Sequence, residues 1–512
     1  MPGRALISVW EKEGVATFAR GLHDLGFELV SSGGTAAHLE DHGLPVTRVE
    51  EVTGAPEMLG GRVKTLHPRI HAGILARREL PEDVAALAEQ EIEPFDVVCV
   101  NLYPFASVAG KPGVSDEEAI EMIDVGGPSM LRAAAKNFAH VAAVCDTRQY
   151  EVVLRELRTN GAVSAETRRR LAAEAFAATA EYEAAIASWF SRSDGFPEQL
   201  TLSFRKVSDL AYGENPHQAA ALYWEVGARR HLLSRVEQLG GKELSYNNLA
   251  DLEGARRVAR ELHEPAAVIV KHGNPCGVAV GATIEEAWER ALAADPVSAF
   301  GCVAVLNREV PAALGERIAG HFVEVLFAPN YEFAAIEALR RKEALRILAD
   351  GERRAERPGE RDLKRVLGGL LVQDRDEEIE TKDGMKVVTG TVGAETWNDV
   401  LFAWTVCKHV SSNAIVLARD RQTIGVGAGQ MSRVDAVRIA VEKAQQHGHD
   451  IRGAVLASDA FFPFADGPEV ALEAGVTTIV QPGGSRRDAE VLAAVERAGA
   501  AMVLTGRRHF RH

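Results

Sequence analysis

Residues 5–35 read ALISVWEKEGVATFARGLHDLGFELVSSGGT, with a helix-like stretch between two short apolar runs. The runs at residues 5–9 and 27–30 have the length and composition of buried strands. Strands that alternate with helices in this way predict a parallel sheet covered by helices. The second run leads directly into the loop at residues 31–35, whose glycines and hydroxyls could hold a phosphate at a helix N-terminus. A tight turn without a ligand would explain the same loop, so the neighbouring motifs must decide.

The same alternation continues along the chain and predicts an α/β protein throughout. In the first part, apolar runs at residues 96–100 and 140–144 predict two more buried strands, and the Ala-rich residues 165–190 predict a long helix. The break at residues 191–197 predicts a boundary between domains 1–197 and 198–512. In the second part, six further runs predict strands at residues 267–270, 302–306, 414–417, 454–456, 478–480 and 502–504. Residues 333–365 predict charged surface helices, broken at Pro358-Gly359.

Length, charge and cysteine content exclude several classes of protein. At 512 residues the chain exceeds the roughly 250 to 300 residues that one hydrophobic core usually supports. A net charge of −15 would repel a phosphate backbone, so we expect no nucleic-acid partner, although a pocket can be locally basic. No apolar run in the sequence reaches the roughly 18 residues of a membrane span, and we expect no membrane partner. The five cysteines form neither a disulfide framework nor a zinc motif, which favours a cytoplasmic protein with reduced thiols.

Cations and polar side chains follow the predicted strands of the first part. Lys12 follows the first strand, and the loop at residues 60–68, GGRVKTLHP, carries two more cations. Because the carboxyl ends of strands in an open α/β sheet meet at one crevice, these residues should surround one ligand. The groups expected to form one constellation there are Lys64, Tyr103, Asp124 and Lys136. An acid, a base and a cation around an anionic ligand indicate proton transfer, which pure phosphate binding does not require.

In the second part, Lys271-His272 follows an apolar run and precedes Gly273-Asn274-Pro275-Cys276. A neutral imidazole at a strand end can act as a base near pH 7, and the adjacent lysine would help to keep it deprotonated. The alternative is a buried histidine that is hydrogen-bonded to backbone. Lys408-His409 repeats the dipeptide and suggests two related halves. Residue 279 is an alanine where zinc deaminases have a second cysteine, so the sequence predicts no metal site.

In chain order these motifs resemble the family of bifunctional purine biosynthesis enzymes that combine phosphoribosylaminoimidazolecarboxamide (AICAR) formyltransferase with inosine monophosphate (IMP) cyclohydrolase. The resemblance spans nearly the whole chain and rests on residues 32–35, 60–68, 101–105, 123–127, 132–137, 212–218, 271–272, 295–301, 425–433 and 458–464. It implies an N-terminal methylglyoxal-synthase-like parallel sheet domain and a C-terminal transformylase region of two cytidine-deaminase-like halves without zinc. It also implies a homodimer.

The resemblance implies the last two steps of de novo IMP synthesis, which act on small molecules. The 5-amino group of AICAR would take a formyl group from the cosubstrate 10-formyltetrahydrofolate. Formyl-AICAR would then close to IMP with loss of water. The family implies no required metal, and a bound potassium ion is compatible with it.

The resemblance also assigns site residues. In the cyclohydrolase, it makes Lys64, Tyr103, Asp124 and Lys136 catalytic. In the transformylase, it makes His272 the general base, Lys271 its positioning group and Asn413 a hydrogen-bond donor to the oxyanion. Substrate-binding residues implied by the family are Lys12, Ser32, Gly34, Thr35, Arg62, Thr65, Asn101, Gly126, Tyr212, His217, Arg433, Phe461, Asp466 and Arg508. Among these, Phe461 would contact the pterin, and Arg433 or Arg508 would bind a carboxylate or phosphate.

Three residues depart from the family pattern. Trp10 stands where a serine is expected near the phosphate, and Ala211 stands where an arginine usually precedes Tyr212. Cys302 follows Gly301 where a second glycine is common, so its side chain would crowd the ligand loop. These departures leave two alternatives open. One is an enzyme with a single working activity, and the other is a nucleotide-sensing module that binds phosphates without chemistry.

Overall fold

The computed structural model describes residues 3–111, 113–193, 195–226, 236–350 and 361–512. The chain forms two compact units, Met1–Lys206 with Tyr223–Arg229 and Val207–Leu222 with Arg230–His512. The boundary after residue 197 stays a prediction. Within the described ranges, no helix is long and apolar enough to cross a membrane. Each unit is described separately below.

The first unit contains a five-stranded parallel sheet in the order β3-β2-β1-β4-β5. Its strands are β1 (Arg4–Val9), β2 (Glu28–Ser31), β3 (Thr47–Arg48), β4 (Val97–Asn101) and β5 (Ala142–Val144). The central strand is β1, in which Leu6 lies opposite Val30 on one side and Val98 on the other. The apolar runs therefore predicted four of these strands correctly, and the parallel α/β architecture is confirmed.

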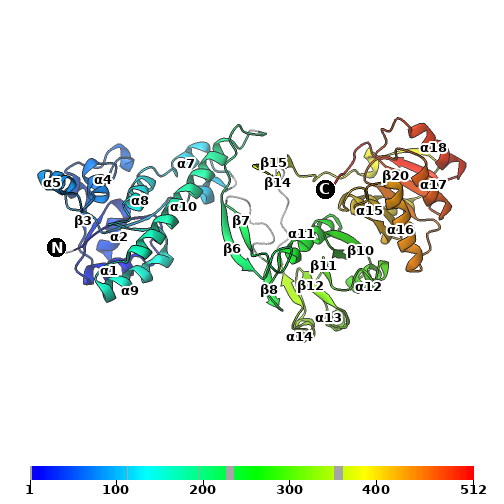
Figure 1. Cartoon of the computed structure of the whole chain (residues 1–512), viewed down its shortest axis with the longest axis horizontal. Helices are drawn as coiled ribbons and strands as arrows, with labels where there is room; N and C mark the ends of the chain where they lie inside the picture. Colours follow the sequence, from blue (N-terminus) through cyan, green and yellow to red (C-terminus); the bar gives the residue numbers. More distant parts are fainter. Residues whose placement is uncertain (1–2, 112, 194, 227–235, 351–360) are drawn as a thin grey trace. The chain divides into compact units, whose positions relative to one another are not determined.

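Helices cover both faces of this sheet (Figure 1). One face packs against α1 (Val15–Asp24), α2 (Gly33–Asp41) and α9 (Tyr150–Asn160), and the other against α4 (Pro68–Leu75), α8 (Gly126–Lys136) and α10 (Ala165–Phe190). Side chains alternate between the faces along β1, so that Ile7 enters one core and Leu6 the other. Burial on both faces explains why the strands are continuous apolar runs. Shorter helices lie in the connections: α3 (Val49–Thr53), α5 (Pro81–Glu89), α6 (Phe105–Ala109) and α7 (Asp116–Ile120).

The second unit contains a twelve-stranded mixed sheet in the order β16-β21-β20-β19-β17-β18-β10-β9-β11-β12-β13-β8. Its first half consists of β8 (Glu237–Gly240), β9 (Ala266–Lys271), β10 (Asn274–Val280), β11 (Cys302–Leu306), β12 (Val323–Ala328) and β13 (Arg346–Ala349). Its second half consists of β16 (Lys386–Thr389), β17 (Ile415–Arg419), β18 (Gln422–Gly427), β19 (Val455–Ser458), β20 (Thr478–Gln481) and β21 (Ala501–Leu504).

The two halves repeat the same topology. Each half contains an antiparallel hairpin, β9–β10 or β17–β18. The first strand of the hairpin also pairs antiparallel with a third strand, β11 or β19. Two further strands, β12 and β13 or β20 and β21, extend the sheet in parallel from this third strand. An antiparallel edge strand completes each half, and β10 pairs with β18 at the centre. This repetition supports the predicted pair of related halves.

Helices also cover both faces of the large sheet. One face packs against α11 (Tyr246–Glu261) and α15 (Ala394–Lys408) in a core shared by the two halves. The other face carries α12 (Ile284–Ala294), α13 (Ala312–Ala319) and α14 (Phe333–Arg340) on the first half, and α16 (Arg433–Gln446), α17 (Asp466–Glu473) and α18 (Asp488–Arg497) on the second (Figure 1). The remaining strands form two small two-stranded sheets. One pairs β6 (Phe204–Leu210) with β7 (Ala220–Glu225), and the other pairs β14 (Arg361–Val366) with β15 (Gly369–Asp374).

Two expectations about the second part were wrong. Of the described residues in 333–350 and 361–365, only α14 is helical, because Ile347 and Leu348 of β13 are fully buried between β12 and β8 and residues from 361 on belong to β14. The predicted break at Pro358-Gly359 lies outside the described residues. The repeated Lys-His dipeptide does not mark equivalent positions, since Lys271-His272 ends β9 and enters a hairpin turn whereas Lys408-His409 ends α15. The turn equivalent to that of His272 joins β17 to β18.

Candidate active sites

Lys12 and Thr35 form a buried contact at the carboxyl end of β1. The Thr35 hydroxyl accepts a hydrogen bond from the Val9 amide (3.1 Å) and donates one to the Val9 carbonyl (2.9 Å). The Lys12 ammonium donates to the same hydroxyl (3.0 Å) and to the Val9 carbonyl. Burial lowers the pKa of Lys12, and the charge of Lys64 lowers it further. The two ammonium groups therefore repel each other, and a bound anion would relieve this repulsion.

The N-terminus of α2 lies beside these two lysines. The buried Ser32 precedes the helix, and Gly33 adopts a left-handed conformation with φ 51°. A Cβ atom at Gly33 would lie 3.1 Å from the Lys64 ammonium, which shows how close that cation comes to the backbone. The first amides of a helix have no partner within it and attract anions. Apart from its chain neighbours and the helix backbone, a Cβ atom at Gly34 would have no other atom within 4 Å, so the space beside these amides is open to a ligand.

The loop that carries Lys64 contains one central cation and one peripheral cation. The Lys64 ammonium lies 4.0 Å from a Glu57 carboxylate oxygen. Arg62 instead forms an exposed ion pair with Glu121, a type of pair that contributes little to stability. Thr65 is buried, and its hydroxyl would lie 2.6 Å from a Cβ atom at Gly126. The structure thus joins Thr65 and Gly126, and it places Arg62 at the edge.

Asp124 and Tyr103 provide the titratable groups of the same site. The Asp124 carboxylate accepts a hydrogen bond from the Gly127 amide (2.8 Å), and Tyr182 holds the Asp124 amide at 2.7 Å. Burial raises the pKa of Asp124, although the Gly127 hydrogen bond and the charge of Lys64 oppose this. Burial also raises the pKa of Tyr103, and the negative charge of Asp124 raises it further. The site therefore holds a carboxyl group with a raised pKa beside a phenol, and both groups can exchange protons with a bound ligand.

Asn101 and Trp10 form one wall of this region. The Asn101 side chain accepts hydrogen bonds from the backbone amides of Trp10 (2.5 Å) and Glu11 (3.0 Å), and it donates to the Glu11 carbonyl (3.1 Å). Asn101 therefore shapes the loop after β1. The half-exposed Trp10 ring lies 4.9 Å from the Tyr103 ring. Trp10 thus adds an aromatic surface where the family pattern has a hydroxyl.

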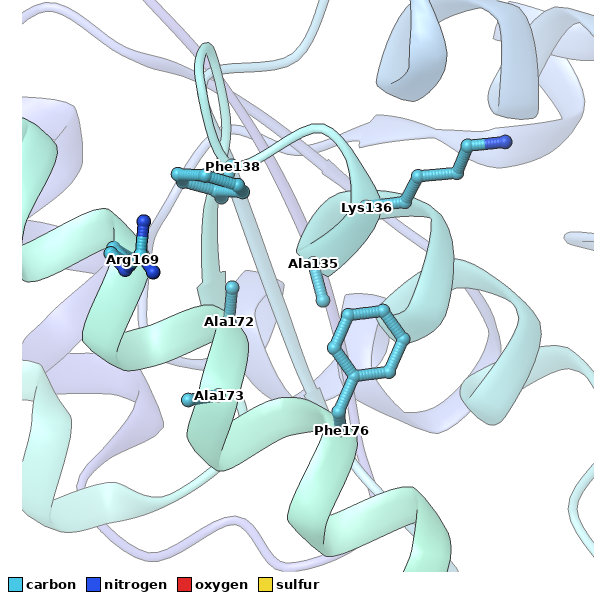
Figure 2. Close-up of a pocket in the computed structure, with 7 residues that line it drawn as sticks. All are labelled: Ala135, Lys136, Phe138, Arg169, Ala172, Ala173 and Phe176. Atoms are coloured by element: carbon cyan, nitrogen blue, oxygen red, sulfur yellow. The ribbon is translucent and has the colours of Figure 1, made fainter.

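Lys136, the fourth residue of the predicted catalytic set, ends the eleven-residue α8. Its backbone lies about 15 Å along the helix axis from Gly126. There it borders a pocket of about 310 Å³ with Arg169, Phe138 and Phe176. Figure 2 shows the Lys136 side chain extended away from both phenylalanine rings. The structure brings together Lys12, Lys64, Tyr103 and Asp124, and the place of Lys136 in this constellation stays a prediction.

The Lys271-His272 pair lies at the β9–β10 hairpin of the second unit. The Lys271 ammonium donates to the carbonyls of Phe300 (3.0 Å) and Gly301 (2.5 Å). An ammonium group has three hydrogens, so one is left for a ligand. His272 is exposed at the tip of the turn, which excludes the alternative of a buried histidine bonded to backbone.

The loop that holds Lys271 is itself fixed by a buried charged cluster. Asp295 accepts hydrogen bonds from the Ser298 amide (2.9 Å) and the Lys443 ammonium (2.9 Å), and it lies 3.0 Å from the His447 ring nitrogen. Hydrogen bonds from Ser298 and Lys443 lower the pKa of Asp295 even though burial acts in the opposite direction. The loop carbonyls can therefore hold Lys271 in one place.

Asn413 and Arg433 are bonded to each other. Arg433 donates to the Asn413 side-chain oxygen (2.8 Å), to the Ser458 hydroxyl (2.8 Å) and to the Asp459 carboxylate. The Asn413 amide nitrogen donates to the carbonyls at residues 430 (2.8 Å) and 431 (3.2 Å). In this conformation Arg433 is a buried structural cation, and the Asn413 N–H groups are already used. That Arg433 binds an anionic ligand and that Asn413 donates to an oxyanion stay predictions, and either role would require these contacts to be exchanged for contacts to the ligand.

The remaining predicted binding residues lie at the surface of the second unit. Phe461, His217 and Asp466 are exposed, Tyr212 is half-buried, and the Arg508 guanidinium lies over the Phe510 ring at 4.5 Å. The structure does not join these residues to His272 by any contact that defines a role.

Two of the departures from the family pattern can now be located. Ala211 is exposed, and its amide donates to the Leu244 carbonyl (3.0 Å). Cys302 is buried in the apolar core at the start of β11, so the expectation that its side chain crowds the ligand loop was wrong.

Sequence reasoning missed several residues that shape the two sites. Glu57 lies three residues before the loop at residues 60–68, and its contact with Lys64 depends on how that loop folds. Tyr182 lies in α10, and only the fold brings it to Asp124. Asp251 lies within α11 and accepts a hydrogen bond from the turn of His272. The sequence of α11 is rich in polar and charged residues, so no local pattern singled out Asp251.

The chain is similar in sequence to known proteins over nearly its whole length. The sequence model of the family described as AICARFT/IMPCHase bienzyme matches residues 134–443, and that of the MGS-like domain matches residues 14–129. The chain is 50% identical over 516 residues to the Bifunctional purine biosynthesis protein PurH of Listeria welshimeri serovar 6b, covering 99% of this chain and 100% of the relative. The protein of the same name from Listeria innocua serovar 6a has the same identity and coverage. A solved structure described as Crystal structure of ForH is 38% identical, covers 37% of this chain and 100% of that chain, and has a TM-score of 0.34.

Proposed function

Because this chain belongs to the AICARFT/IMPCHase bienzyme family, we propose that its two units divide two consecutive reactions between them. The protein is a bifunctional enzyme of purine biosynthesis, with AICAR formyltransferase and IMP cyclohydrolase activities that complete IMP. In the proposal, the first unit closes the ring and the second unit transfers the formyl group.

The observation that carries the proposal is the convergence of Lys12 and Lys64 on the N-terminus of α2, beside Asp124 and Tyr103. Two ammonium groups and unpaired helix amides suit the phosphate of a ribotide. A titratable acid beside them is not needed for phosphate binding alone, so it favours chemistry over simple sensing.

Ring closure in the first unit joins two groups of one bound molecule. The carboxamide nitrogen of formyl-AICAR attacks the formyl carbon, and water leaves from the resulting carbinolamine. Because both groups are on the same substrate, correct positioning supplies much of the rate. In the proposal, Lys64 stabilises the developing oxyanion, and Asp124 with Tyr103 moves the protons to and from the reacting atoms. Lys12, Ser32, Gly34, Thr35 and Thr65 hold the ribotide.

Formyl transfer in the second unit needs a base because the 5-amino group of AICAR is a poor nucleophile. In the proposal, the exposed His272 takes the proton from this amine as it attacks the formyl carbon of 10-formyltetrahydrofolate. Lys271, held by two carbonyls, directs its remaining hydrogen towards the ligand. Asn413 acts through the loop at residues 430–431, which its amide orders.

Further parts of the proposal concern the state of the protein. We propose that the protein is a homodimer. We also propose a cytoplasmic location, which the free thiols among the described residues support. Within the described ranges, no group of three or more His, Cys, Asp or Glu side chains could hold a metal ion. Potassium binding stays a prediction of the family, and activity in potassium and sodium buffers would test it.

The proposed function is tested by supplying AICAR and 10-formyltetrahydrofolate and following tetrahydrofolate and IMP separately. Both products should appear. The variant His272→Ala should abolish tetrahydrofolate formation, and Lys64→Ala should abolish IMP formation from preformed formyl-AICAR. One product without the other would support an enzyme with a single activity. Ribotide binding without either product would support a sensing module and overturn the proposal.

A further inference from the structure

The turn that carries His272 has an unusual backbone. His272 and Gly273 join β9 to β10 with φ values of 49° and 73°. A two-residue hairpin turn with both φ values positive is type I′, and its central positions favour glycine, asparagine or aspartate. Histidine is uncommon in this region of backbone space. The turn therefore needs support from its surroundings to keep the imidazole at its tip.

Asp251 provides this support from beneath the turn. Its carboxylate accepts a hydrogen bond from the Gly273 amide at 2.6 Å, and it also accepts one from the His272 backbone. Burial raises the pKa of Asp251, while these hydrogen bonds and the charges of His272 and Lys271 oppose the rise. From the other side, Arg511 donates to the Gly273 carbonyl at 2.6 Å. The amides and the carbonyl of the turn are thus both held.

The second half of the sheet contains the same device without a histidine. Asp420 and Arg421 join β17 to β18 with φ values of 52° and 55°. The carboxylate of Asp399 accepts hydrogen bonds from the Asp420 amide (3.0 Å) and the Arg421 amide (2.6 Å). Asp399 is the sixth residue of α15, as Asp251 is the sixth residue of α11.

The side chains at the tips of the two turns differ. Arg421 forms an ion pair with Glu264 (2.9 Å), and Arg290 donates to the Asp420 carbonyl. These contacts make the second turn structural. The first turn instead exposes an imidazole. Both aspartates hold the backbone of a left-handed turn, and this structural role is common to the two halves. Only Asp251 has the additional effect of placing a histidine at the tip of its turn.

We propose that Asp251 is a positioning residue for formyl transfer, which holds the left-handed turn so that His272 faces the substrate and places a negative charge behind it. This inference rests on the proposed role of His272 as the base. Substitution of Asp251 should therefore act on formyl transfer through the geometry of the turn that carries His272.

The test compares Asp251→Ala with the matched control Asp399→Ala. Asp251→Ala should lower kcat for formyl transfer by roughly 10- to 100-fold, as expected when a reacting group is misplaced by about 1 Å, and should leave the KM for AICAR nearly unchanged. Asp399→Ala should leave kcat unchanged below its unfolding temperature. Closure of formyl-AICAR, followed on the same samples, should be unaffected by either substitution.

A conservative substitution distinguishes positioning from a loss of structure. Asp251→Asn keeps the volume and one acceptor oxygen for the turn amides, so it should fold and recover part of the kcat that Asp251→Ala loses. A kcat for Asp251→Asn no higher than that of Asp251→Ala, a loss in Asp251→Ala that appears in the KM for AICAR and not in kcat, or equal kcat for the two alanine variants would overturn the inference. Full formyl transfer by His272→Ala would instead show that the proposed base is wrong.

Discussion

Arg433→Met should destabilise the second unit strongly. The Arg433 side chain is 6% exposed and the Asp459 side chain is completely buried, so the pair is removed from water. Removing one partner of a buried ion pair costs about 3 to 5 kcal/mol, because the remaining charge stays buried. Asp459 keeps hydrogen bonds from the Ser412 hydroxyl (2.5 Å) and the Ala414 amide (3.2 Å). We therefore expect the lower end of this range, about 3 kcal/mol.

The assay must report on the second unit alone, because a protein of two units need not unfold in one transition. Amide hydrogen exchange of peptides from β17 and β19, measured by mass spectrometry, gives the local opening free energy. Arg433→Met combined with Asp459→Asn should recover part of the loss, since the carboxylate is then gone. A loss below about 1 kcal/mol, together with much weaker AICAR binding, would refute the reasoning and restore Arg433 as a ligand-binding residue.

Two further predictions concern a histidine and a lysine. Burial alone would lower the pKa of His509, but hydrogen bonds with Asp376 and Glu380 outweigh it and raise the pKa. The wild type should be more stable than His509→Gln, and this difference should be complete below about pH 6.5. It should disappear as the pH rises through the raised pKa of His509. Unfolding temperatures of both proteins from pH 5.5 to 9 would measure the difference. A constant difference across that range would contradict this. Lys136→Ala should slow closure of formyl-AICAR less than Lys64→Ala, because the charge of Lys64 acts directly on Asp124. Equal losses in single-turnover assays would place Lys136 among the residues that act on the substrate.

The strands were predictable where both faces of a sheet are buried. Residues 302–306 form an apolar run because one set of side chains packs under α11 and the other under α12 and α13. Residues 346–349 were not predictable, since this short strand follows charged residues and is recognised only by its place between β12 and β8. Short apolar runs in charged surroundings carry too little periodic signal to separate strand from helix.

The candidate sites were predictable where chain topology alone brings residues together. Lys12 and Tyr103 follow adjacent parallel strands, so the rule for strand ends placed them together. The same rule does not reach Lys136, because Lys136 ends a helix and does not follow a strand. The bond between Asn413 and Arg433 depends on side-chain contacts across the fold, which no local pattern encodes. Sequence analysis therefore named the residues of the second site without finding which of them are already bonded to each other.

In the proposed mechanism, two separate sites act in succession on one substrate. The most direct test supplies AICAR and 10-formyltetrahydrofolate to His272→Ala, to Lys64→Ala and to an equal mixture of the two variants, and measures IMP. Each variant alone should form almost no IMP, and the mixture should form it, because formyl-AICAR released by one variant is closed by the other. Wild-type IMP formation by either variant alone, or none by the mixture, would contradict the account.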